Sequence, residues 1–523
     1  MSNQIYGIDL GTTYSALSRI DEFGLPRVVK NHEGDDTTPS VIFFEGANNI
    51  VVGAEAKRAA VADPDNAVSL IKRHMGQRYD VRYQGKDYTP ESLSALILKE
   101  MVNAANAVTG DNVNKVVITV PAYFGAQERE STKTAGKTAG LDVVGIVTEP
   151  VAAALSITAN SQSPETLLVY DLGGGTFDTT VIKVDLDRTD GPPIETVATG
   201  GERLLGGADW DDRLAGIVVD KLKAQLGITH DPLEDVDFRV ELLQEIEDRK
   251  KTLSKREAST LRLNYEGARA TVEVTRAEFE EATRDLVAQT IEATRRTIQE
   301  ARSKYPGLVI DRVLMVGGSS KMPMIAEALR ANGWNPQPTE YDLAVALGAS
   351  IYGVKSTEHA ATAGSGHDAG DVGGLSESVF VSNVLSRALG ILWMRKDGSK
   401  YIKSYFHAQQ ALPAGPEIDQ GFTRHPGQAY VLVELFEQGG QAESENPDDN
   451  RKLADVMLPI PPGSAAGYPV NIVLNITDEG LCTVDAVDPQ TGQTAWLEGA
   501  ISILSQEEIQ DQTTQVGMMR TRS

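Results

Sequence analysis

Two segments far apart in the chain share the residue types that a nucleoside triphosphate needs: an aspartate, then glycines, then threonines. They contain Asp9, Gly11, Thr12 and Thr13 in the first segment, and Asp171, Gly173, Gly174, Gly175 and Thr176 in the second. Glycine lacks a Cβ, so the backbone turns tightly and its N–H groups approach phosphate oxygens. Threonine hydroxyls add donors, and an aspartate can hold Mg²⁺, which binds one or two carboxylates plus phosphate and water. The two segments together predict a Mg-nucleotide site between two phosphate-binding hairpins.

The surroundings of the two segments also correspond. An apolar run precedes each aspartate, at residues 5–8 and 167–170. Each segment therefore reads as a strand, a turn and a second strand, which predicts two related lobes facing each other across a cleft. One such turn alone is more often structural, and the repetition favours the functional interpretation.

A third glycine pair, Gly317 and Gly318, follows the apolar run 313–316 and precedes Ser319 and Lys321. A strand, a Gly-Gly turn and a helix suit the close approach of a nucleoside to the backbone. Glycine at a strand–helix turn also has purely steric reasons. The segment does not have the ending of a Walker loop, and no dinucleotide fingerprint follows the first strand.

The elements that must position these turns alternate between apolar runs and amphipathic segments, for example residues 90–107 and 276–302. This alternation over residues 1–355 predicts an α/β domain with largely parallel central sheets. Residues 356–383, rich in Ala, Gly and Ser at their start, predict a flexible linker. Period-two runs then predict a mostly β domain over 384–504, followed by a short tail at 505–523.

The composition is that of a globular chain with two or more domains: 523 residues, 41% hydrophobic and 24% charged. The net charge of −25 argues against nucleic acid as the main partner, because phosphate contacts need clustered Lys and Arg. It serves solubility, or forms an acidic face for a basic partner. The single Cys482 excludes an internal disulfide. Without a visible leader or a long apolar run, we expect a cytoplasmic chain with no membrane partner.

Several runs carry a family resemblance. GIDLGTTYSAL (7–17), VPAYF (120–124), EPVAAAL (149–155), VYDLGGGTFD (169–178) and VLMVGGSSKMP (313–323) closely resemble the DnaK-type heat-shock chaperones, the Hsp70-like proteins. The resemblance implies a two-lobed, actin-like ATPase domain with ribonuclease H-like halves, followed by a smaller all-β sandwich. Actins and sugar kinases share this ATPase fold, but VPAYF and EPVAAAL are similar to the chaperone branch.

The resemblance assigns catalytic roles. Lys72 stands where the family has a lysine near the γ-phosphate, and Glu149 where it has a Glu-Pro turn that positions water. Asp171 and Asp178 are candidates to orient water or accept a proton, and Thr176 completes the catalytic set. Without the resemblance, Lys72 would be a helix-face lysine and Glu149 a solvated loop acid.

The same resemblance implies the cofactor ATP/ADP with Mg²⁺, held through Asp9 and Asp171, and K⁺ as a further candidate ion. The other implied nucleotide contacts are Gly11, Thr12, Thr13, Gly173, Gly174, Gly175, Gly206, Glu247, Lys250, Lys251, Ser254, Gly317, Gly318, Ser319, Lys321 and Asp342. Many relatives have Arg where Lys251 and Lys321 stand, and an ammonium does not stack on a base, so we expect weaker nucleotide binding. Pro121 and Arg129 resemble a pair that signals nucleotide state to the neighbouring domain.

Residues 384–504 resemble the family's sandwich that binds unfolded or extended peptides. Tyr430 and Leu432 are the predicted peptide contacts, with Ile472 and Leu474 as further candidates, although period-two apolar positions are core by default. Tyr430 replaces a small aliphatic residue of relatives, which would narrow the pocket.

Three departures concern the coupling of the domains. Ser505 and Glu508 form a capping-box pattern, and the short tail after them leads us to expect a form without the helical lid and with fast peptide exchange. Residues 379–383 are less apolar than the family's linker. Gly145 replaces an arginine that docks the J-domain co-chaperone, so ordinary J-domain stimulation is not expected, while a nucleotide exchange factor remains a candidate partner.

The leading hypothesis is therefore an ATP-dependent chaperone and ATPase of the DnaK type. The alternative is a nucleotide-binding adaptor with little turnover that docks one partner through its β-domain. A small-molecule kinase on the same fold is the third class.

Overall fold

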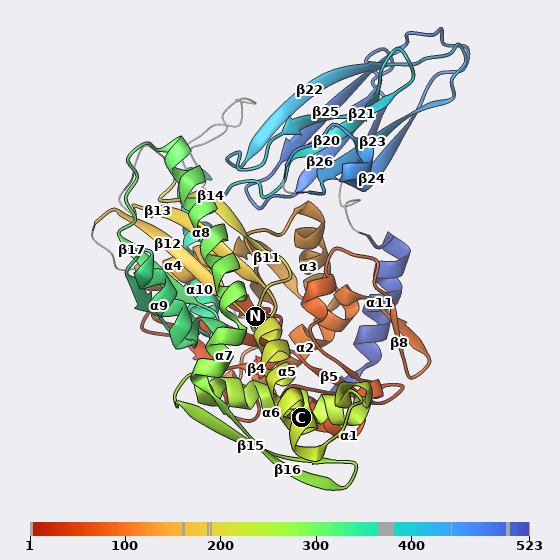
Figure 1. Ribbon diagram of the computed structural model, residues 1–523. Coiled ribbons are helices and arrows are strands. Elements are labelled where there is room, and N and C mark those ends of the chain that lie inside the picture. Colours follow the sequence, from red (N-terminus) through yellow and green to blue (C-terminus); the bar gives the residue numbers. More distant parts are fainter. Residues whose placement is uncertain are drawn as a thin grey trace.

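The computed structural model describes residues 4–158, 163–185, 188, 191–364, 381–440, 442–497 and 503–521. The N-terminal part forms two lobes around two central sheets (Figure 1). The lobe I sheet consists, in order, of β11 (Asp142–Thr148), β10 (Lys115–Val120), β1 (Ile5–Asp9), β2 (Tyr14–Ile20) and β3 (Pro26–Val29), with β4 (Thr38–Pro39) beside β2. The lobe II sheet consists of β18 (Pro336–Pro338), β17 (Arg312–Val316), β12 (Glu165–Leu172), β13 (Phe177–Val184), β14 (Ile194–Glu202) and β19 (Val381–Ser382).

The two sheets have the same local topology, which confirms the predicted relation between the lobes. Strand β1 is parallel to β10 and antiparallel to β2, and strand β12 is parallel to β17 and antiparallel to β13. The sheets are mixed rather than largely parallel, so that prediction was wrong. The reason lies in the glycine turns: a short turn joins antiparallel strands, whereas a parallel pair needs a long crossover.

Helices α4 (Glu149–Thr158) and α10 (Ala344–Gly364) join the two sheets through one buried apolar cluster. They approach closely, since an ideal Cβ on Gly348 would lie 1.6 Å from the carbonyl oxygen of Ala152. Helix α10 continues to Gly364, so residues 356–364, predicted as linker, are helical, in keeping with the high helix propensity of their alanines. The predicted linker residues 365–380 lie outside the described residues, and β19 then extends the lobe II sheet.

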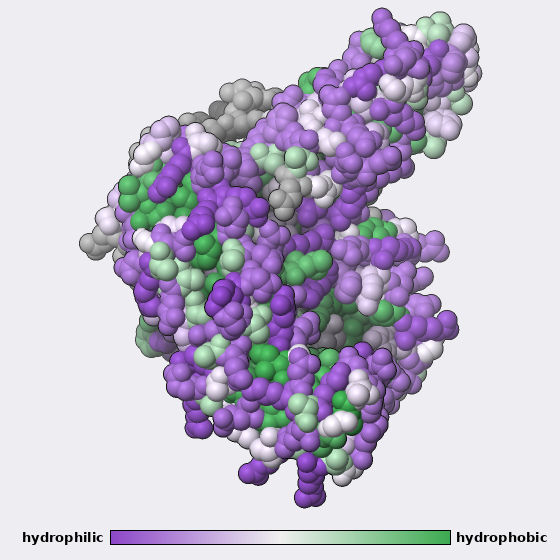
Figure 2. Space-filling model, in the orientation of Figure 1, coloured by the Kyte–Doolittle hydropathy of each residue, from purple (hydrophilic) through white to green (hydrophobic). Residues whose placement is uncertain are grey.

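The outer parts of the lobes carry the remaining helices and hairpins. In lobe I these are β5 (Ile42–Gly46), β6 (Asn49–Val52), α1 (Ala54–Ala62), β7 (Ala67–Val68), β8 (Val81–Tyr83), β9 (Lys86–Tyr88), α2 (Pro90–Thr109) and α3 (Ala126–Thr138). In lobe II they are α5 (Gly207–Leu226), α6 (Val236–Leu253), β15 (Ala258–Tyr265), β16 (Ala268–Thr275), α7 (Arg276–Ala282), α8 (Arg284–Lys304) and α9 (Pro323–Ala331). The visible face is mostly hydrophilic (Figure 2). No helix in the described ranges is long and apolar enough to cross a membrane.

The second domain is a sandwich of two antiparallel four-stranded sheets. One contains β21 (Lys400–Phe406), β20 (Leu389–Met394), β23 (Tyr430–Gln438) and β24 (Asn450–Pro459), and the other β22 (Ala414–Phe422), β25 (Pro469–Ile476), β26 (Cys482–Val487) and β27 (Thr494–Leu497). Every second residue of β25 points inward, including Ile472 and Leu474, which are buried. These two candidate peptide contacts are therefore core residues.

The C-terminal tail packs on lobe I rather than on the sandwich (Figure 1). Helix α11 (Gln506–Met518) begins with the predicted capping box of Ser505 and Glu508. Its end carries Val516 and Met519 into the apolar core of lobe I, and β28 (Arg520–Thr521) adds a parallel strand to β6. The ammonium of Lys99 donates to the carbonyl oxygens of Val516 at 2.8 Å and Met519 at 3.0 Å, a favourable charge at a helix C-terminus.

This packing predicts different effects for two adjacent methionines. Met519 is 2% exposed and Met518 is 61% exposed. We expect Met519→Ala to lower the local unfolding free energy of the tail by about 2 kcal/mol or more, because it leaves a core cavity. Met518→Ala should change it by less than about 0.5 kcal/mol. Hydrogen exchange of residues 506–521 measures both, and equal effects would show that the tail does not belong to the lobe I core.

Candidate functional site

The two glycine turns lie against each other between the lobes. An ideal Cβ on Gly174 would lie 2.4 Å from Thr13 Oγ1, and one on Gly175 would lie 2.7 Å from Thr12 Cγ2. Side chains at these positions would push the hairpins apart. Glycine is therefore required here by the close approach of the lobes, as well as by the backbone N–H groups that a phosphate needs.

Local bonds hold the shape of each turn. The N–H of Gly11 donates to Ser15 Oγ at 3.1 Å, and the carbonyl oxygen of Gly11 accepts from Ser40 Oγ at 2.8 Å. In the second turn the N–H of Gly173 donates to the carbonyl oxygen of Thr176 at 3.0 Å. These bonds within the chain fix the backbone of each turn.

Four carboxylates and one lysine interact beside the turns. Lys72, which is buried, donates from Nζ to Glu149 Oε1 at 2.5 Å. Asp171 and Asp178 are direct partners on β12 and β13, so their side chains share one face of the sheet. Asp9, at the end of β1, accepts from Thr119 Oγ1 at 3.1 Å. The structure thus brings together the predicted catalytic residues Lys72, Glu149 and Asp171 and the predicted metal-binding residue Asp9.

The cluster has an excess of negative charge. Burial, and then the charge of Glu149, raises the pKa of Asp9 to about 7 against the opposing effect of Lys72. Burial and Glu149, in that order, also raise the pKa of Asp171 and of Asp178. For Lys72, burial alone would lower the pKa, but Glu149 and Asp9 outweigh it and raise the pKa. Lys72 therefore stays charged, and one ammonium does not balance four carboxylates.

A magnesium ion fits this donor set if the nucleotide completes its shell. Among the described residues, no group of three or more His, Cys, Asp or Glu side chains is arranged to hold a metal ion. Mg²⁺ characteristically keeps several waters and takes one or two carboxylates together with phosphate oxygens. Asp9 and Asp171 each stand two residues before the first glycine of a turn.

Arg73, which sequence reasoning missed, also binds the second turn. Its Nε and Nη2 donate to the carbonyl oxygen of Gly175 at 3.1 and 2.9 Å, and its Nη2 lies 3.5 Å from Asp209 Oδ2. Arg73 and Lys72 lie in the short helical turn η2 (Ile71–His74), which follows Leu70 in a left-handed conformation. The adjacency of the two basic residues was the signal that could have revealed it.

A charged clasp, formed by Glu247 with Lys57, Lys251 and Tyr14, joins the two lobes. Glu247, on α6 of lobe II, forms ion pairs with Lys57 of α1 and, at 2.8 Å, with Lys251. The hydroxyl of Tyr14 in lobe I donates to Glu247 Oε1 at 2.9 Å. Burial alone would raise the pKa of Glu247, but the two lysines lower it to about 2. The predicted nucleotide contacts Glu247 and Lys251 thus also bridge the lobes.

Three segments meet where the resemblance places the nucleoside. An ideal Cβ on Gly207 would lie 2.2 Å from Ser319 Oγ, and Lys250 Nζ donates to the carbonyl oxygen of Gly207 at 2.8 Å. Gly317 has a φ of 81°, which favours glycine, and its Cβ would lie 2.4 Å from the carbonyl oxygen of Leu172. The start of α5, the end of α6 and the turn after β17 therefore form one surface.

The other predicted nucleotide contacts lie around this surface. Gly206 precedes α5, and a Cβ there would lie 2.5 Å from the backbone of the second turn. Ser254 ends α6 and donates to a carbonyl one turn earlier. Lys321 forms an ion pair with Asp342, and an ideal Cβ on Gly318 would lie 3.0 Å from Asp342 Oδ1.

Comparison with known families supports the same interpretation. A family model described as Hsp70 protein matches residues 5–82 and 78–522. The chain belongs to the Hsp70 protein family. Members of this family are ATPases that bind ATP or ADP with Mg²⁺ and act as chaperones on unfolded peptides. The match covers both the two-lobed domain and the sandwich.

In this Hsp70 chain the sandwich contacts lobe I through Glu479. The carbonyl oxygen of Glu479 accepts from Arg129 Nη1 at 2.9 Å, and its carboxylate pairs with Lys133 at 3.2 Å and accepts from the N–H of Ile146 at 3.1 Å. An ideal Cβ on Gly145 would lie 3.6 Å from Glu479 Oε1, so position 145 faces the sandwich. Burial lowers the pKa of Arg129 to about 10, although Glu479 opposes this. The predicted relay residue Arg129 therefore lies at the domain contact.

Pro121 lies at the other end of the turn that precedes α3. Its carbonyl oxygen accepts from the N–H of Phe124 at 3.1 Å. The carbonyl oxygen of Phe124 in turn accepts from Arg129 Nε at 2.9 Å and from Ser386 Oγ of the sandwich at 3.2 Å. Residues 121–124 thus connect the cleft wall to the second domain.

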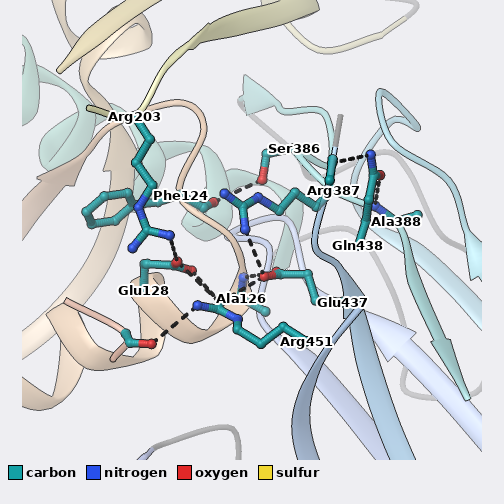
Figure 3. Close-up of polar contacts among 12 residues, drawn as sticks. Phe124, Ala126, Glu128, Arg203, Ser386, Arg387, Ala388, Glu437, Gln438 and Arg451 are labelled. Carbon is teal, nitrogen blue, oxygen red and sulfur yellow. Dashed lines mark hydrogen bonds and ion pairs between the residues drawn. The ribbon is translucent and has the colours of Figure 1, made fainter. Parts of the chain in front are cut away.

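A buried ionic junction, also missed by sequence reasoning, connects all three bodies (Figure 3). Glu128 of lobe I pairs with Arg203 of lobe II at 3.3 Å and with Arg451 of the sandwich at 3.1 Å. Arg451 also pairs at 2.8 Å with Glu437, which lies 3.6 Å from Arg387. Glu128 and Glu437 have side chains only 1% exposed. Nothing in the sequence distinguishes these charges from solvated ones.

The two predicted peptide contacts lie on the outer face of the sandwich. Tyr430 and Leu432 are 47% and 41% exposed, and Met457, directly opposite Leu432 on β24, is 55% exposed. These three side chains form an apolar stripe along neighbouring strands.

The opposed turns predict that a methyl group at position 174 weakens nucleotide binding. Gly174→Ala places its Cβ against Thr13 and separates the phosphate-binding backbones, so we expect the Kd for Mg-ADP to rise at least about tenfold, or about 1.4 kcal/mol. Gly216→Ala, in α5 with nothing within 4 Å of its Cβ, is the matched control. Titration calorimetry measures both variants, and an unchanged Kd in Gly174→Ala would exclude phosphate binding between the turns.

Proposed function

We propose that this chain is an ATP-dependent chaperone of the DnaK type, which binds and hydrolyses Mg-ATP between its two glycine turns. The observation that carries the proposal is the buried Lys72–Glu149 pair among Asp9, Asp171 and Asp178, beside turns that approach each other without side chains. The phosphates of a nucleoside triphosphate would accept hydrogen bonds from the N–H groups of the turns and from Lys72. Its divalent cation would bind the carboxylates.

Each residue has a role that follows from its charge and position. Lys72 offsets the charge that develops on the transferred phosphoryl group, and Thr176 offers a hydroxyl donor beside it. Glu149 and Asp171 orient the attacking water, and their carboxylates accept its proton through hydrogen bonds. The bound Mg²⁺ supplies charge neutralisation on the phosphates. Asp178 holds the N–H of Tyr123 at 3.4 Å and so connects this chemistry to residues 121–124.

The sandwich supplies the peptide-binding function. The stripe of Tyr430, Leu432 and Met457 offers exposed apolar area to an extended peptide. The contacts of Arg129 with Glu479 and of Glu128 with Arg451 link the position of the sandwich to the lobes. Nucleotide state would change peptide affinity through these contacts.

The ATPase role predicts a large effect of Lys72. We expect Lys72→Ala to slow single-turnover ATP hydrolysis by about 10²–10³-fold, the usual effect of removing one preorganised electrostatic group. Lys30→Ala, at an exposed lysine that contacts Asp36 and the carbonyl oxygen of Gly34, controls for the loss of a surface charge and should leave the rate unchanged. An unfolded peptide should alter the wild-type rate.

The same assay separates the proposal from the adaptor alternative. Tight Mg-ATP binding with negligible turnover, indifferent both to peptide and to Lys72→Ala, would refute the chaperone function and favour a nucleotide-binding adaptor.

The peptide-binding role predicts that Leu432→Asp weakens binding of an unfolded peptide about tenfold, because a carboxylate replaces apolar contact area worth about 1–2 kcal/mol. The exposed position keeps the sandwich folded. Met518→Asp, at an exposed apolar residue on α11, is the control. Fluorescence anisotropy of a labelled peptide measures the change, and equal affinities would place the peptide site elsewhere.

A further inference from the structure

Helix α3 begins without a capping side chain of its own. Its N-cap residue is Gly125, which makes no side-chain cap bond. The first N–H groups of a helix lack partners within the helix and need acceptors from elsewhere. Here the acceptor comes from the other domain: the N–H of Ala126 donates to Glu437 Oε1 at 3.2 Å. A carboxylate also interacts favourably with the positive end of the helix dipole.

The contact with Glu437, and not the local backbone conformation, explains why residue 125 is a glycine. Gly125 has φ −75° and ψ −176°, an extended conformation that any residue adopts. An ideal Cβ there, however, would lie 2.1 Å from Glu437 Oε1 and 2.8 Å from Oε2. The missing side chain makes room for the carboxylate of the sandwich.

Buried charges fix that carboxylate in place. Burial, and then Glu128, raises the pKa of Glu437, while Arg451 and Arg387 oppose the rise. Arg451 lies between the two carboxylates, and Glu128 continues the network to Arg203 in lobe II (Figure 3). If the sandwich undocks, the helix cap and the Glu128–Arg451 ion pair are lost together.

The start of α3 is directly connected to the cleft. The N–H of Tyr123 donates to Asp178 Oδ1 at 3.4 Å, and Lys72 Nζ lies 5.9 Å from the centre of the Phe124 ring. Only Gly125 separates Phe124 from α3. A change in the first turn of α3 therefore reaches the side chains beside Lys72 and Asp178 within three residues of the chain.

We propose that Glu437 is a positioning residue for the nucleotide cleft: it caps α3 from the sandwich, and so holds residues 121–124 against Asp178 and Lys72 while the sandwich is docked. The effect on turnover rests on the proposed ATPase function, whereas the capping itself does not.

The test compares hydrogen exchange of residues 122–130 in the full chain with Glu437→Ala, and uses Glu434→Ala as the matched control. Glu434 lies on the same strand and pairs with Lys452 at the surface. Loss of the cap should speed exchange of the first turn of α3 at least about fivefold. Glu434→Ala should have no such effect. Unchanged exchange in Glu437→Ala would overturn the proposal.

A rescue variant separates capping from general destabilisation of the interface. Gly125→Ser supplies a hydroxyl cap while its Cβ excludes Glu437, so in the Glu437→Ala background it should restore protection of residues 122–130. Gly125→Ala in the same background should not. Failure of the serine to restore protection would overturn capping as the cause.

The consequence for the cleft is measured by single-turnover hydrolysis. We expect Glu437→Ala to change the rate at which bound ATP is hydrolysed severalfold. The affinity for Mg-ADP should stay within about twofold of wild type, because Glu437 contacts none of the predicted nucleotide-binding residues. Altered exchange with an unaltered rate would overturn the link to the cleft. If the wild type does not hydrolyse ATP, the proposed function fails, and the exchange comparison still decides whether Glu437 caps α3.

Discussion

The rest of the structure depends on one electrostatic constraint: the cleft buries more carboxylates than its single lysine can balance. Burial and the charge of Glu149 raise the free-energy cost of ionising Asp9, Asp171 and Asp178, and the ammonium of Lys72 opposes this effect. Buried like charges are stable only when cations or fixed dipoles compensate them. The cleft therefore favours the binding of a cation together with the anion that coordinates it. The opposed glycine turns supply the N–H groups for that anion.

The lobes must be held at a fixed separation for this site to exist. The contact of Gly174 with Thr13 and the close crossing of α4 and α10 leave no room for side chains, which fixes the distance between the lobes. The clasp of Glu247 with Lys57 and Tyr14 joins the lobes at a further point. The domain junction repeats the principle of the cleft, since the buried carboxylate of Glu128 is held by Arg203 of lobe II and Arg451 of the sandwich, and that of Glu437 by two arginines of its own domain. Undocking of the sandwich therefore breaks the Glu128–Arg451 pair and leaves each of these two charges one partner fewer.

The sequence predicted those parts of the site whose residues are close together in the chain. The aspartate and glycine turns repeat a local pattern, and the shared topology around β1 and β12 confirmed the two related lobes. Lys72 and Glu149 carry no local signal, and only the family resemblance pointed to them before the structure paired them. The mixed character of the sheets was missed, although the same short turns imply it.

What sequence reasoning missed depends on contacts between distant segments. Arg203, Glu128 and Arg451 come from three bodies, and each resembles an ordinary solvated charge until the fold buries it. The tail has few apolar residues, so Val516 and Met519 did not reveal that it packs into lobe I. Gly125 shows the same limit, because a glycine is needed there only to make room for a carboxylate from another domain.

A crystal structure of the full chain with Mg²⁺ and a non-hydrolysable ATP analogue tests the central claim most directly. The account predicts the β- and γ-phosphates between the two glycine turns, with Lys72 Nζ within hydrogen-bonding distance of the γ-phosphate and the ion bound on the side of Asp9 and Asp171. A nucleotide bound outside this cleft, or a Lys72 that stays paired with Glu149 and remote from the phosphates, would contradict it.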